Sequence, residues 1–333
     1  MDLRNCAYCY ASAAGFKACS KCGHRFYCSR EHQVLDWKKG HKHWCGKAGE
    51  LGYDFEVRAA EGKGLGLFAL RDFQRCEKIL VERPVITVDK HDAAALARVR
   101  LPPDEAASVQ TAVDALAPGS GDLRRTFETN CCALDDGDSA GGLFVHFSRV
   151  NHDCVGNSAH VFVPEHGLML LVANFEISRG AEVTFSYCEQ VPSKAERAWK
   201  LQFAWGFSCA CAACNDAGLG AKLDRVYDLD AAVARLGSTG NVAASLRAGR
   251  ALVCLYDELR LPRRLYSRTF YDMFQIAISK RAHHRDAFKF IKLYPALSHE
   301  HAQLYYGCDC QEVRMKAKLV ADPSSHRNYN PYN

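Results

Sequence analysis

Cysteines and histidines near the N-terminus stand in closely spaced pairs, the arrangement that metal ions require. Four pairs fall within residues 6–45: Cys6 and Cys9, Cys19 and Cys22, Cys28 and His32, and His41 and Cys45. Each pair lets one turn present two ligands to one ion, and eight ligands suffice for two tetrahedral zinc ions. We expect the pairs to interleave, so that the first and third bind one ion and the second and fourth bind the other. Both sites would be filled by protein ligands, which is typical of structural zinc.

A second cysteine cluster lies two thirds of the way along the chain. Cys209, Cys211 and Cys214 provide three ligands and lack a fourth. Cys154 is the natural candidate, because it lies in an irregular segment and has no other evident role. A third structural zinc ion would then tie residues 209–214 to the segment around Cys154. The alternative, a cysteine cluster without metal, is the weaker interpretation at this spacing.

Residues 148–157, which contain Cys154, show neither helical nor strand periodicity, and apolar runs flank them on both sides. They are expected to form a polar turn buried against a core. Buried polar groups need partners. We expect Asn151 and His152 to find theirs in a cofactor, and Cys154 to find its partner in a metal.

Composition and charge limit the functions to consider. The chain has 333 residues and 17 cysteines, and no apolar run is long enough to span a membrane. The N-terminus lacks the pattern of a signal peptide, so the cysteines favour thiolate and metal chemistry over disulfides. Residues 1–50 contain nine basic and four acidic residues, residues 51–216 contain 16 basic and 23 acidic residues, and residues 217–333 contain 18 basic and 11 acidic residues. An acidic middle favours a cationic substrate over nucleic acid; solvated faces without partners are the plainer explanation.

The elements that must position these residues can be outlined from periodicity. Strands are expected at 53–60, in the region 77–88, in a hairpin of 159–164 with 168–173, and before Tyr187. A glycine-rich loop at 61–66 and two short helices within 91–117 lie between them, and residues 122–131 are expected to be helical or partly so. A helix is expected at 193–203. Helices are also expected at 223–236, 243–261, 265–280 and 311–321, followed by a frayed end at 323–333.

Four segments in this order resemble the SET-domain protein lysine methyltransferases, the SET-and-MYND group in particular. They are the glycine loop 62–66, residues 149–157, residues 180–187 and the cysteine-rich segment 209–214. The N-terminal pairs, with Tyr27 and Asp36-Trp37, resemble a MYND finger. With the finger, the resemblance spans residues 1–216, and the domain order, with the finger ahead of the glycine loop, is similar to fungal and other lower-eukaryote members.

The resemblance implies an α+β fold: a small N-terminal zinc finger (1–47) and a β-rich knotted SET domain (48–190) with a helical insertion at about 90–121. A zinc-bound post-SET segment (191–216) and an α-helical, tetratricopeptide-like C-terminal domain (217–333) would follow. It implies S-adenosylmethionine as the methyl donor, a protein lysine as acceptor and three structural zinc ions. The MYND finger implies a possible proline-rich peptide partner, whereas DNA binding is disfavoured. A cytoplasmic or nuclear location follows, with no membrane association.

Site residues follow from the same resemblance. Tyr187 matches the catalytic tyrosine. The residues that match cofactor-contacting positions are Lys63, Gly64, Asn130, Asn151, His152, Tyr187 and Phe207.

The sequence departs from the family pattern at four places. His32 stands where cysteine is usual, Asp153 where serine is usual, Gly156 where proline is common, and Trp205 where a second active-site tyrosine is expected. Trp205 leaves open a second function, a catalytically weak or inactive adaptor that binds protein partners. A zinc-dependent DNA-binding protein is the third alternative, which the acidic middle disfavours.

Overall fold

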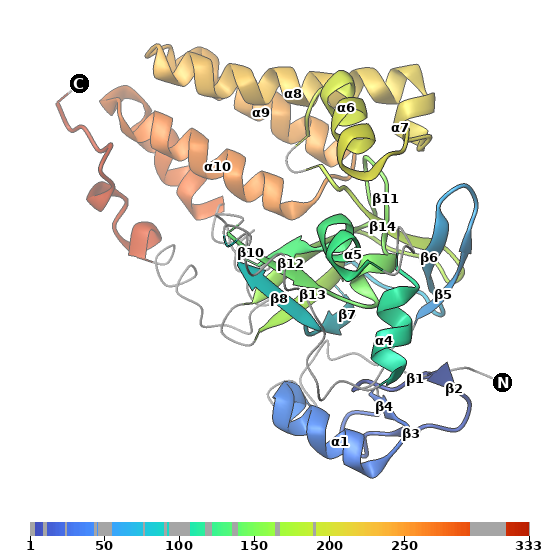
Figure 1. The fold of residues 1–333 in the computed structure, drawn as a ribbon. Helices are drawn as coiled ribbons and strands as arrows, with labels where there is room; N and C mark the ends of the chain where they lie inside the picture. Colours follow the sequence, from blue (N-terminus) through green and yellow to red (C-terminus); the bar gives the residue numbers. More distant parts are fainter. Residues whose placement is uncertain are drawn as a thin grey trace. The chain divides into compact units, whose positions relative to one another are not determined.

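A computed structural model describes residues 4–8, 12–23, 25–42, 45, 55–75, 77–89, 92, 107–116, 122–134, 139–163, 167–188, 191–293 and 318–332. The chain divides into two compact units (Figure 1). The first contains Met1–Asn151 and Gly156–Phe185, and the second contains His152–Val155 and Ser186–Asn333. Each unit is described by itself below.

The N-terminal part of the first unit is built from very short elements. Strands β1 (Arg4–Asn5) and β2 (Ser12–Ala13) pair antiparallel, as do β3 (Lys17–Ala18) and β4 (Phe26–Tyr27). Helix α1 (Arg30–Asp36) begins at Ser29, whose hydroxyl accepts the His32 N–H, and a π-helical turn η1 (Trp37–His41) follows. So small a module cannot bury a large core, and therefore needs other stabilisation such as metal binding.

Three small sheets form the rest of the first unit. Their strand orders are β11-β14-β6-β5, β12-β13-β7 and β8-β10-β9. The strands are β5 (Phe55–Ala60), β6 (Gly64–Ala69), β7 (Lys78–Glu82), β8 (Ile86–Asp89), β9 (Cys132–Ala133), β10 (Ala140–Leu143), β11 (Asn151–His152), β12 (Ser158–Val163), β13 (Leu168–Ala173) and β14 (Glu182–Phe185). Every residue of β7 and β13 is buried; β13 is apolar throughout, whereas β7 begins and ends with the charged residues Lys78 and Glu82.

Two helices pack against one of these sheets. Helix α5 (Leu123–Asn130) begins at Asp122, whose carboxylate accepts the N–H groups of Arg124 and Arg125, and α4 (Ala107–Asp114) precedes it. Val113 and Phe127 from these helices share a buried core with Ile86 and Leu143 from β8 and β10. The 3-10 turn η2 (Phe147–Arg149) then leads into β11.

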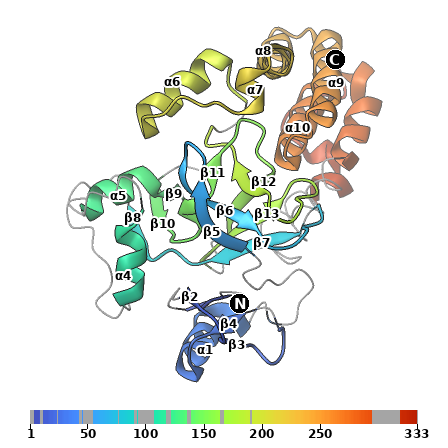
Figure 2. The same ribbon diagram turned by 90° about the vertical axis from the view of Figure 1, so that its right-hand side faces the viewer.

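The second unit is largely helical. It contains α6 (Lys194–Trp205), α7 (Ala212–Asn215), α8 (Ala217–Ser238), α9 (Val242–Glu258), α10 (Arg263–Ile278), the 3-10 turns η3 (Arg281–His283) and η4 (Pro323–Ser325), and a helix at 284–293. Helices α8, α9 and α10 lie side by side in both views (Figures 1 and 2). A Cβ at Gly249 would lie 2.4 Å from Sδ of Met273, so glycine is what lets α9 approach α10 this closely.

The expected strand region 77–88 holds two strands in different sheets, β7 and β8, because Pro84 between them has no N–H for a ladder. Two other expectations from the sequence need correction. The sequence predicted no helix at 284–293. The end of the chain is not frayed throughout, because His326 is buried and stacks edge-on against Phe274. The predicted helix 311–321 falls mostly outside the described residues, and only 318–321 are seen to be helical.

Two general findings bear on function. No helix within the described part of the chain is long and apolar enough to cross a membrane. The cysteines in that part, 13 in number, are all free thiols, as the preference for metal over disulfide chemistry requires.

Candidate active site and metal centres

The first metal-binding candidate joins the turn that follows β3 to the end of η1. Cys19, Cys22, His41 and Cys45 bring their ligand atoms within 4.8 Å of one another. Sγ of Cys22 lies 3.5 Å from Nε2 of His41, so this histidine would bind a metal through Nε2. Burial opposes ionisation of Cys19, but N–H groups of Cys22 and Lys21 outweigh it and lower the pKa of this thiol. A tetrahedral Cys3His set favours zinc.

A network of buried side chains orients His41. The hydroxyl of Tyr27 lies 2.8 Å from Nδ1 of His41 and donates to Oδ2 of Asp36 at 2.7 Å. Arg25 donates to the other oxygen of Asp36 at 2.9 Å. Burial, and then the charge of Asp36, raise the pKa of Tyr27, so its hydroxyl stays protonated. Hydrogen-bond partners of this kind fix the ring orientation of a metal-binding histidine. From the sequence, Tyr27 and Asp36 were identified only as residues of the finger motif.

The second candidate combines Cys6, Cys28 and His32. Sγ of Cys28 lies 2.9 Å from Nδ1 of His32, and Sγ of Cys6 lies 3.7 Å from the same nitrogen. The expected fourth ligand, Cys9, is outside the described residues. Apart from Cys9, the two clusters of the finger contain the residues that interleaved pairing assigns to each ion.

The third candidate lies in the second unit. Cys154, Cys209, Cys211 and Cys214 bring four thiols within 4.8 Å of one another. Sγ of Cys154 lies 3.6 Å from that of Cys214, although 60 residues separate them in the chain. Hydrogen bonds with Cys154 and Cys209 lower the pKa of Cys211, so the set favours at least one thiolate. Four thiolates are a common zinc set.

His152, two residues before Cys154, is buried between this cluster and Tyr187. Its Nδ1 accepts the backbone N–H of Tyr187 at 3.0 Å, and its Nε2 lies 3.4 Å from Sγ of Cys154. Because Nδ1 accepts, the ring carries its proton on Nε2 and donates it to the sulfur. Both ring nitrogens are therefore used within the protein.

Aromatic rings surround Tyr187 in the same unit. Its ring centroid lies 4.9 Å from Trp205 and 6.4 Å from Phe207, and the ring of Phe207 lies 6.0 Å from that of His152. Trp205 is the last residue of α6, and Gly206 ends the helix in the left-handed conformation before Phe207. The bulk of such rings excludes water from the space around the tyrosine and makes it less polar.

Glu182 organises a separate group of residues in the first unit. Its carboxylate accepts from Nδ2 of Asn151 at 2.8 Å and from Nζ of Lys63 at 2.9 Å. Nδ2 of Asn151 also donates to the carbonyl of Leu65 at 3.1 Å. A Cβ at Gly66 would lie 2.8 Å from the Glu182 carboxylate and 2.9 Å from Nδ2 of Asn151, so the close approach needs glycine here. The sequence assigned no role to Glu182.

Two further residues hold the 148–157 segment in place: Glu82, which the sequence interpretation missed, and Asn157, which it named only as a motif residue. Glu82 is buried, and its carboxylate accepts the N–H groups of His146 at 2.9 Å and Phe147 at 2.8 Å, at the start of η2. Asn157 accepts the Thr184 N–H at 2.9 Å and donates to the Glu182 carbonyl at 2.8 Å. An acid in an apolar strand was the only sequence signal for Glu82.

Asn130 is half-buried at the end of α5, and its Nδ2 donates to the carbonyl of Thr126 in its own helix. The Ser148 hydroxyl donates to the Asn130 carbonyl at 3.4 Å. Of the residues expected to bind a cofactor, Lys63, Gly64, Asn130 and Asn151 belong to the first unit, and His152, Tyr187 and Phe207 to the second.

Comparison with known proteins agrees with this geometry. A family model described as MYND finger matches residues 6–45, and one described as SET domain matches residues 64–188. Histone-lysine N-methyltransferase set5 of Schizosaccharomyces pombe is 26% identical over 282 residues, covering 82% of this chain and 85% of that protein. Histone-lysine N-methyltransferase ASHR1 of Arabidopsis thaliana is 29% identical over 220 residues, covering 61% of this chain and 44% of that protein. Histone-lysine N-methyltransferase SMYD3 of Mus musculus is 35% identical over 74 residues, covering 22% of this chain and 17% of that protein.

A zinc-binding finger followed by a small-sheet SET domain and a helical region defines the class of protein. The chain belongs to the SET-and-MYND family of protein lysine methyltransferases. The predicted family and α+β fold class are thus confirmed.

Proposed function

We propose that this protein transfers a methyl group from S-adenosylmethionine to lysine side chains of other proteins. The SET domain and the relatives named as histone-lysine methyltransferases support the reaction class. We further propose domain boundaries near residues 47, 190 and 216, and a nuclear or cytoplasmic location. The finger is proposed to bind a protein partner, of which a proline-rich peptide is one possible kind.

The observation that carries the proposal is the environment of Tyr187. His152 fixes its backbone, and Trp205 and Phe207 surround its ring. A free lysine titrates near ~10.4, so supplying the neutral amine at pH 7 costs about 4.6 kcal/mol. Apolar rings disfavour the ammonium form and so lower the pKa of a bound lysine. The Tyr187 hydroxyl can then accept a hydrogen bond from the amine and orient its lone pair.

We propose that the methyl donor is held by Lys63, Gly64, Asn130, Asn151, His152, Tyr187 and Phe207. When bound, S-adenosylmethionine supplies the methyl group on a positively charged sulfur. The glycine loop fits such a ligand, because Gly64 has a φ of 75° and nothing lies within 4 Å of where its Cβ would be. Its backbone is therefore open to close approach.

Asn151 and His152 would act differently toward the donor. Nδ2 of Asn151 is engaged by Glu182 and Leu65, whereas no hydrogen bond among the described residues uses its Oδ1. We propose that Oδ1 accepts from the amino group of the donor. Because both nitrogens of the His152 ring are occupied, this residue would contact the donor through its backbone. Phe207 would stack on the adenine.

We propose three structural zinc ions. Two would be bound in the finger, by Cys6, Cys9, Cys28 and His32, and by Cys19, Cys22, His41 and Cys45. The third would be bound by Cys154, Cys209, Cys211 and Cys214. Metal analysis of the purified protein should give three zinc ions per chain, and two for a Cys154→Ser variant. An unchanged count in that variant would remove Cys154 from the ligands.

One residue favours a second function. Trp205 replaces the hydroxyl of an expected tyrosine with an indole ring that packs on Tyr187. An adaptor that binds partners but transfers no methyl group would tolerate this replacement, whereas an enzyme must work around it.

The deciding experiment is transfer of tritiated methyl groups from S-adenosylmethionine to a peptide library and to cell extract. Transfer should occur and should fall by at least 100-fold in Tyr187→Phe, which keeps the ring and removes the hydroxyl. Calorimetry should show donor binding that Asn151→Ala weakens and Tyr187→Phe largely retains. Donor binding without transfer to any substrate would favour the adaptor.

A further inference from the structure

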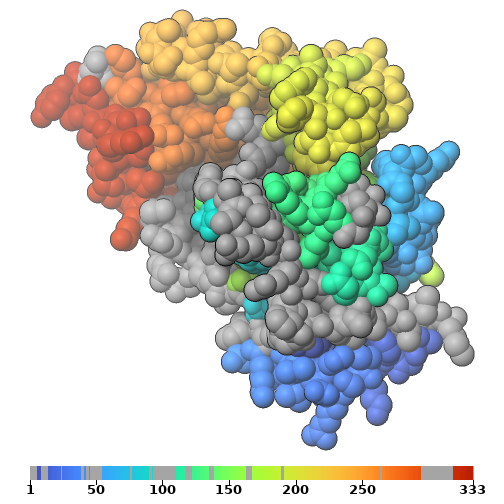
Figure 3. Space-filling view, viewed as in Figure 1, coloured from blue at the N-terminus to red at the C-terminus, as the bar shows by residue number. Residues whose placement is uncertain are grey.

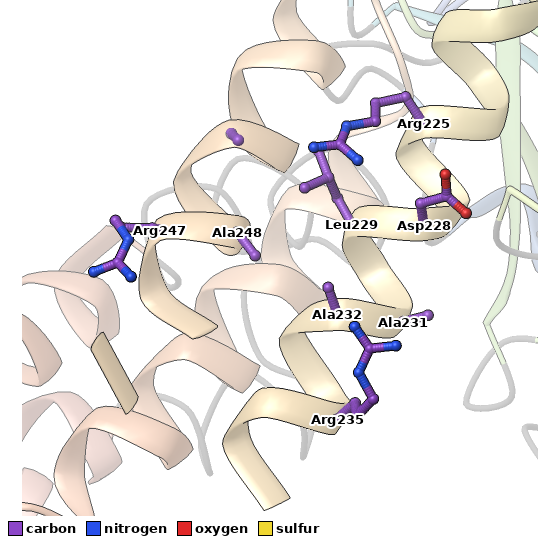
Figure 4. Close-up of a pocket in the computed structure, with 9 residues that line it drawn as sticks. Arg225, Asp228, Leu229, Ala231, Ala232, Arg235, Arg247 and Ala248 are labelled. Atoms are coloured by element: carbon purple, nitrogen blue, oxygen red, sulfur yellow. The ribbon is translucent and has the colours of Figure 1, made fainter. Parts of the chain in front are cut away.

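A groove of about 580 Å³ runs between α8 and α9 in the second unit (Figure 4). Nine residues line it: Arg225, Asp228, Leu229, Ala231, Ala232, Arg235, Arg247, Ala248 and Ala251. None of them binds a proposed metal or belongs to the proposed catalytic site. Helix α8 runs along the surface of the unit in the space-filling view (Figure 3).

Small side chains make the groove. Leu229 is buried at its floor, and alanines of both helices flank it. Because alanine side chains are short, they leave room between the two helices for an elongated ligand. An open channel of this kind suits a chain segment better than a compact molecule, which is normally enclosed on most sides.

Three arginines stand around the groove. Arg225 and Arg235 lie on α8, and Arg247 lies opposite on α9 (Figure 4). All three are exposed, and none makes an ion pair with a described residue. Other cations of the same helices are paired: Lys222 with Glu258 at 2.5 Å, and Arg250 with Asp286 at 3.3 Å. The guanidinium groups at the groove are therefore available to carboxylates, which they can bind in bidentate fashion.

The length of the groove indicates the size of the ligand. Arg225 and Arg235 are ten residues apart in one helix, so about 15 Å separates their positions along the axis. An extended peptide covers that distance with roughly four or five residues. Asp228 lies between them and can accept N–H groups of a peptide backbone. The phosphate backbone of a nucleic acid has no such donors.

Charge along the chain agrees with a protein ligand of mixed charge. Residues 51–216, which contain the SET domain, carry 16 basic and 23 acidic residues, and residues 217–333 carry 18 and 11. An acidic catalytic region and a basic helical region together suit a substrate that has a lysine-containing segment and an acidic segment.

We propose that the α8–α9 groove binds an acidic, extended segment of the protein substrate, away from the lysine that is methylated. Substrate selection would then combine two contacts, a weak one at the lysine and a second at the groove, joined by the substrate chain. The proposal rests on the proposed function as far as turnover is concerned, but binding to the groove can be measured without any methyl transfer.

Binding is tested with the full-length protein and a fluorescein-labelled peptide of five glutamates flanked by Gly-Ser, containing no lysine. The same peptide with glutamines is the control ligand. Fluorescence anisotropy should show binding of the acidic peptide that the double variant R225Q/R247Q weakens by about tenfold. The double variant R250Q/R268Q removes the same charge from neighbouring positions and should change the affinity by less than about twofold. Ala251→Leu keeps every charge, occupies the groove at an exposed position and should also weaken binding.

Three results would overturn the proposal. The first is equal weakening by the two double variants, which would indicate general charge attraction. The second is unchanged binding in Ala251→Leu. The third is failure of the acidic peptide to bind while a 20-base-pair DNA duplex binds in an Arg225- and Arg247-dependent manner.

Turnover gives an independent comparison. Two extended versions of a peptide that the protein methylates are compared. One carries a flexible linker followed by five glutamates, and the other carries the same linker followed by five glutamines. The acidic extension should lower KM about fivefold or more with little change in kcat, and R225Q/R247Q should abolish the difference. If no peptide is methylated, the proposed function fails, and the binding measurement still decides the groove. An acidic extension that leaves KM unchanged would contradict the role in substrate selection.

Discussion

The backbone N–H of Tyr187 donates to Nδ1 of His152 at 3.0 Å, although 35 residues separate the two in the chain. The opposite nitrogen of the same ring lies 3.4 Å from Sγ of Cys154. One buried imidazole thus joins the expected catalytic tyrosine to an expected zinc ligand. The zinc site would therefore influence methyl transfer without taking part in the chemistry, because it fixes the ring that fixes Tyr187.

Substitution of His152 can separate its two contacts. An asparagine side chain places its polar atoms near the position of Nδ1, whereas glutamine reaches toward Nε2. We expect His152→Asn to keep more methyl transfer, and His152→Gln to keep more of the zinc affinity of the Cys154 cluster. Zinc release to a chromophoric chelator measures the second property, and kcat measures the first. Equal losses of both properties in both variants would indicate a purely structural role.

Glu182 is expected to position donor-binding groups without contacting the reacting atoms. Glu182→Ala frees Asn151 and Lys63 from the carboxylate that joins them, and should weaken S-adenosylmethionine binding by about tenfold. Glu182→Gln keeps an acceptor for Asn151 and should cost less. Glu56→Gln, at an acid on β5 that pairs with exposed Arg58, is the matched control. Calorimetric titration with the donor checks the order; equal affinity in all the proteins would contradict it.

Trp205 is expected to limit how many methyl groups the product lysine receives. Its indole packs 4.9 Å from the ring of Tyr187 and takes more space than a tyrosine would. Trp205→Phe keeps a ring and opens the site, so the fraction of di- and trimethylated product should rise at least about threefold. Intact-mass measurement of the product peptide reads the distribution. Trp199→Phe, an exposed tryptophan of the same helix, should leave it unchanged.

Gly156 departs from the family's common proline for a structural reason. A Cβ at this position would lie 2.4 Å from Cα of Phe185, a backbone atom that cannot turn aside. Gly156→Ala should lower the free energy of unfolding by roughly 2 kcal/mol or more, as overpacking does. Gly180→Ala is the control, because a Cβ at this position meets no neighbour although φ is 84°. It introduces backbone strain without a clash and should lower the free energy of unfolding by less than Gly156→Ala does. Denaturant unfolding of both variants checks this; equal stabilities would show that Phe185 moves.

Acidification is expected to loosen the C-terminal end. Burial, and then the charge of Arg327, lower the pKa of His326, whose ring packs against Phe274. The pKa of His326 in the folded protein is therefore below its ordinary value of ~6.5. Folding of this end is favoured by the neutral ring at pH values above ~6.5, and this stabilisation is lost as the pH falls through the lowered pKa. The protection factors of residues 323–332, which compare the exchange rate of each amide with its intrinsic rate at the same pH, should fall between pH 7 and pH 5. His326→Phe keeps a packed ring and should remove that pH dependence; an unaltered pH profile would show that another group titrates.

Local spacing was enough to predict much of this molecule. Two ligands on one turn need only two or three residues between them, so the pairs at 6–45 and 209–214 could be found without a fold. The helices α8, α9 and α10 were likewise expected from periodicity, although their ends differ by several residues. Motifs around Asn151 and Tyr187 then indicated the family, which the comparisons confirm.

Contacts between distant residues were decided only by the tertiary structure. Glu182 meets Lys63 across 119 residues, Glu82 meets Phe147 across 65, and His326 meets the helix that contains Phe274. A sequence shows which groups can form hydrogen bonds, but burial decides which must, because an unpaired polar group is costly only away from water. The sequence by itself therefore determined the kinds of ligand and their local grouping. The fold decided that His152 uses both ring nitrogens within the protein, and that Glu182 joins the glycine loop to Asn151.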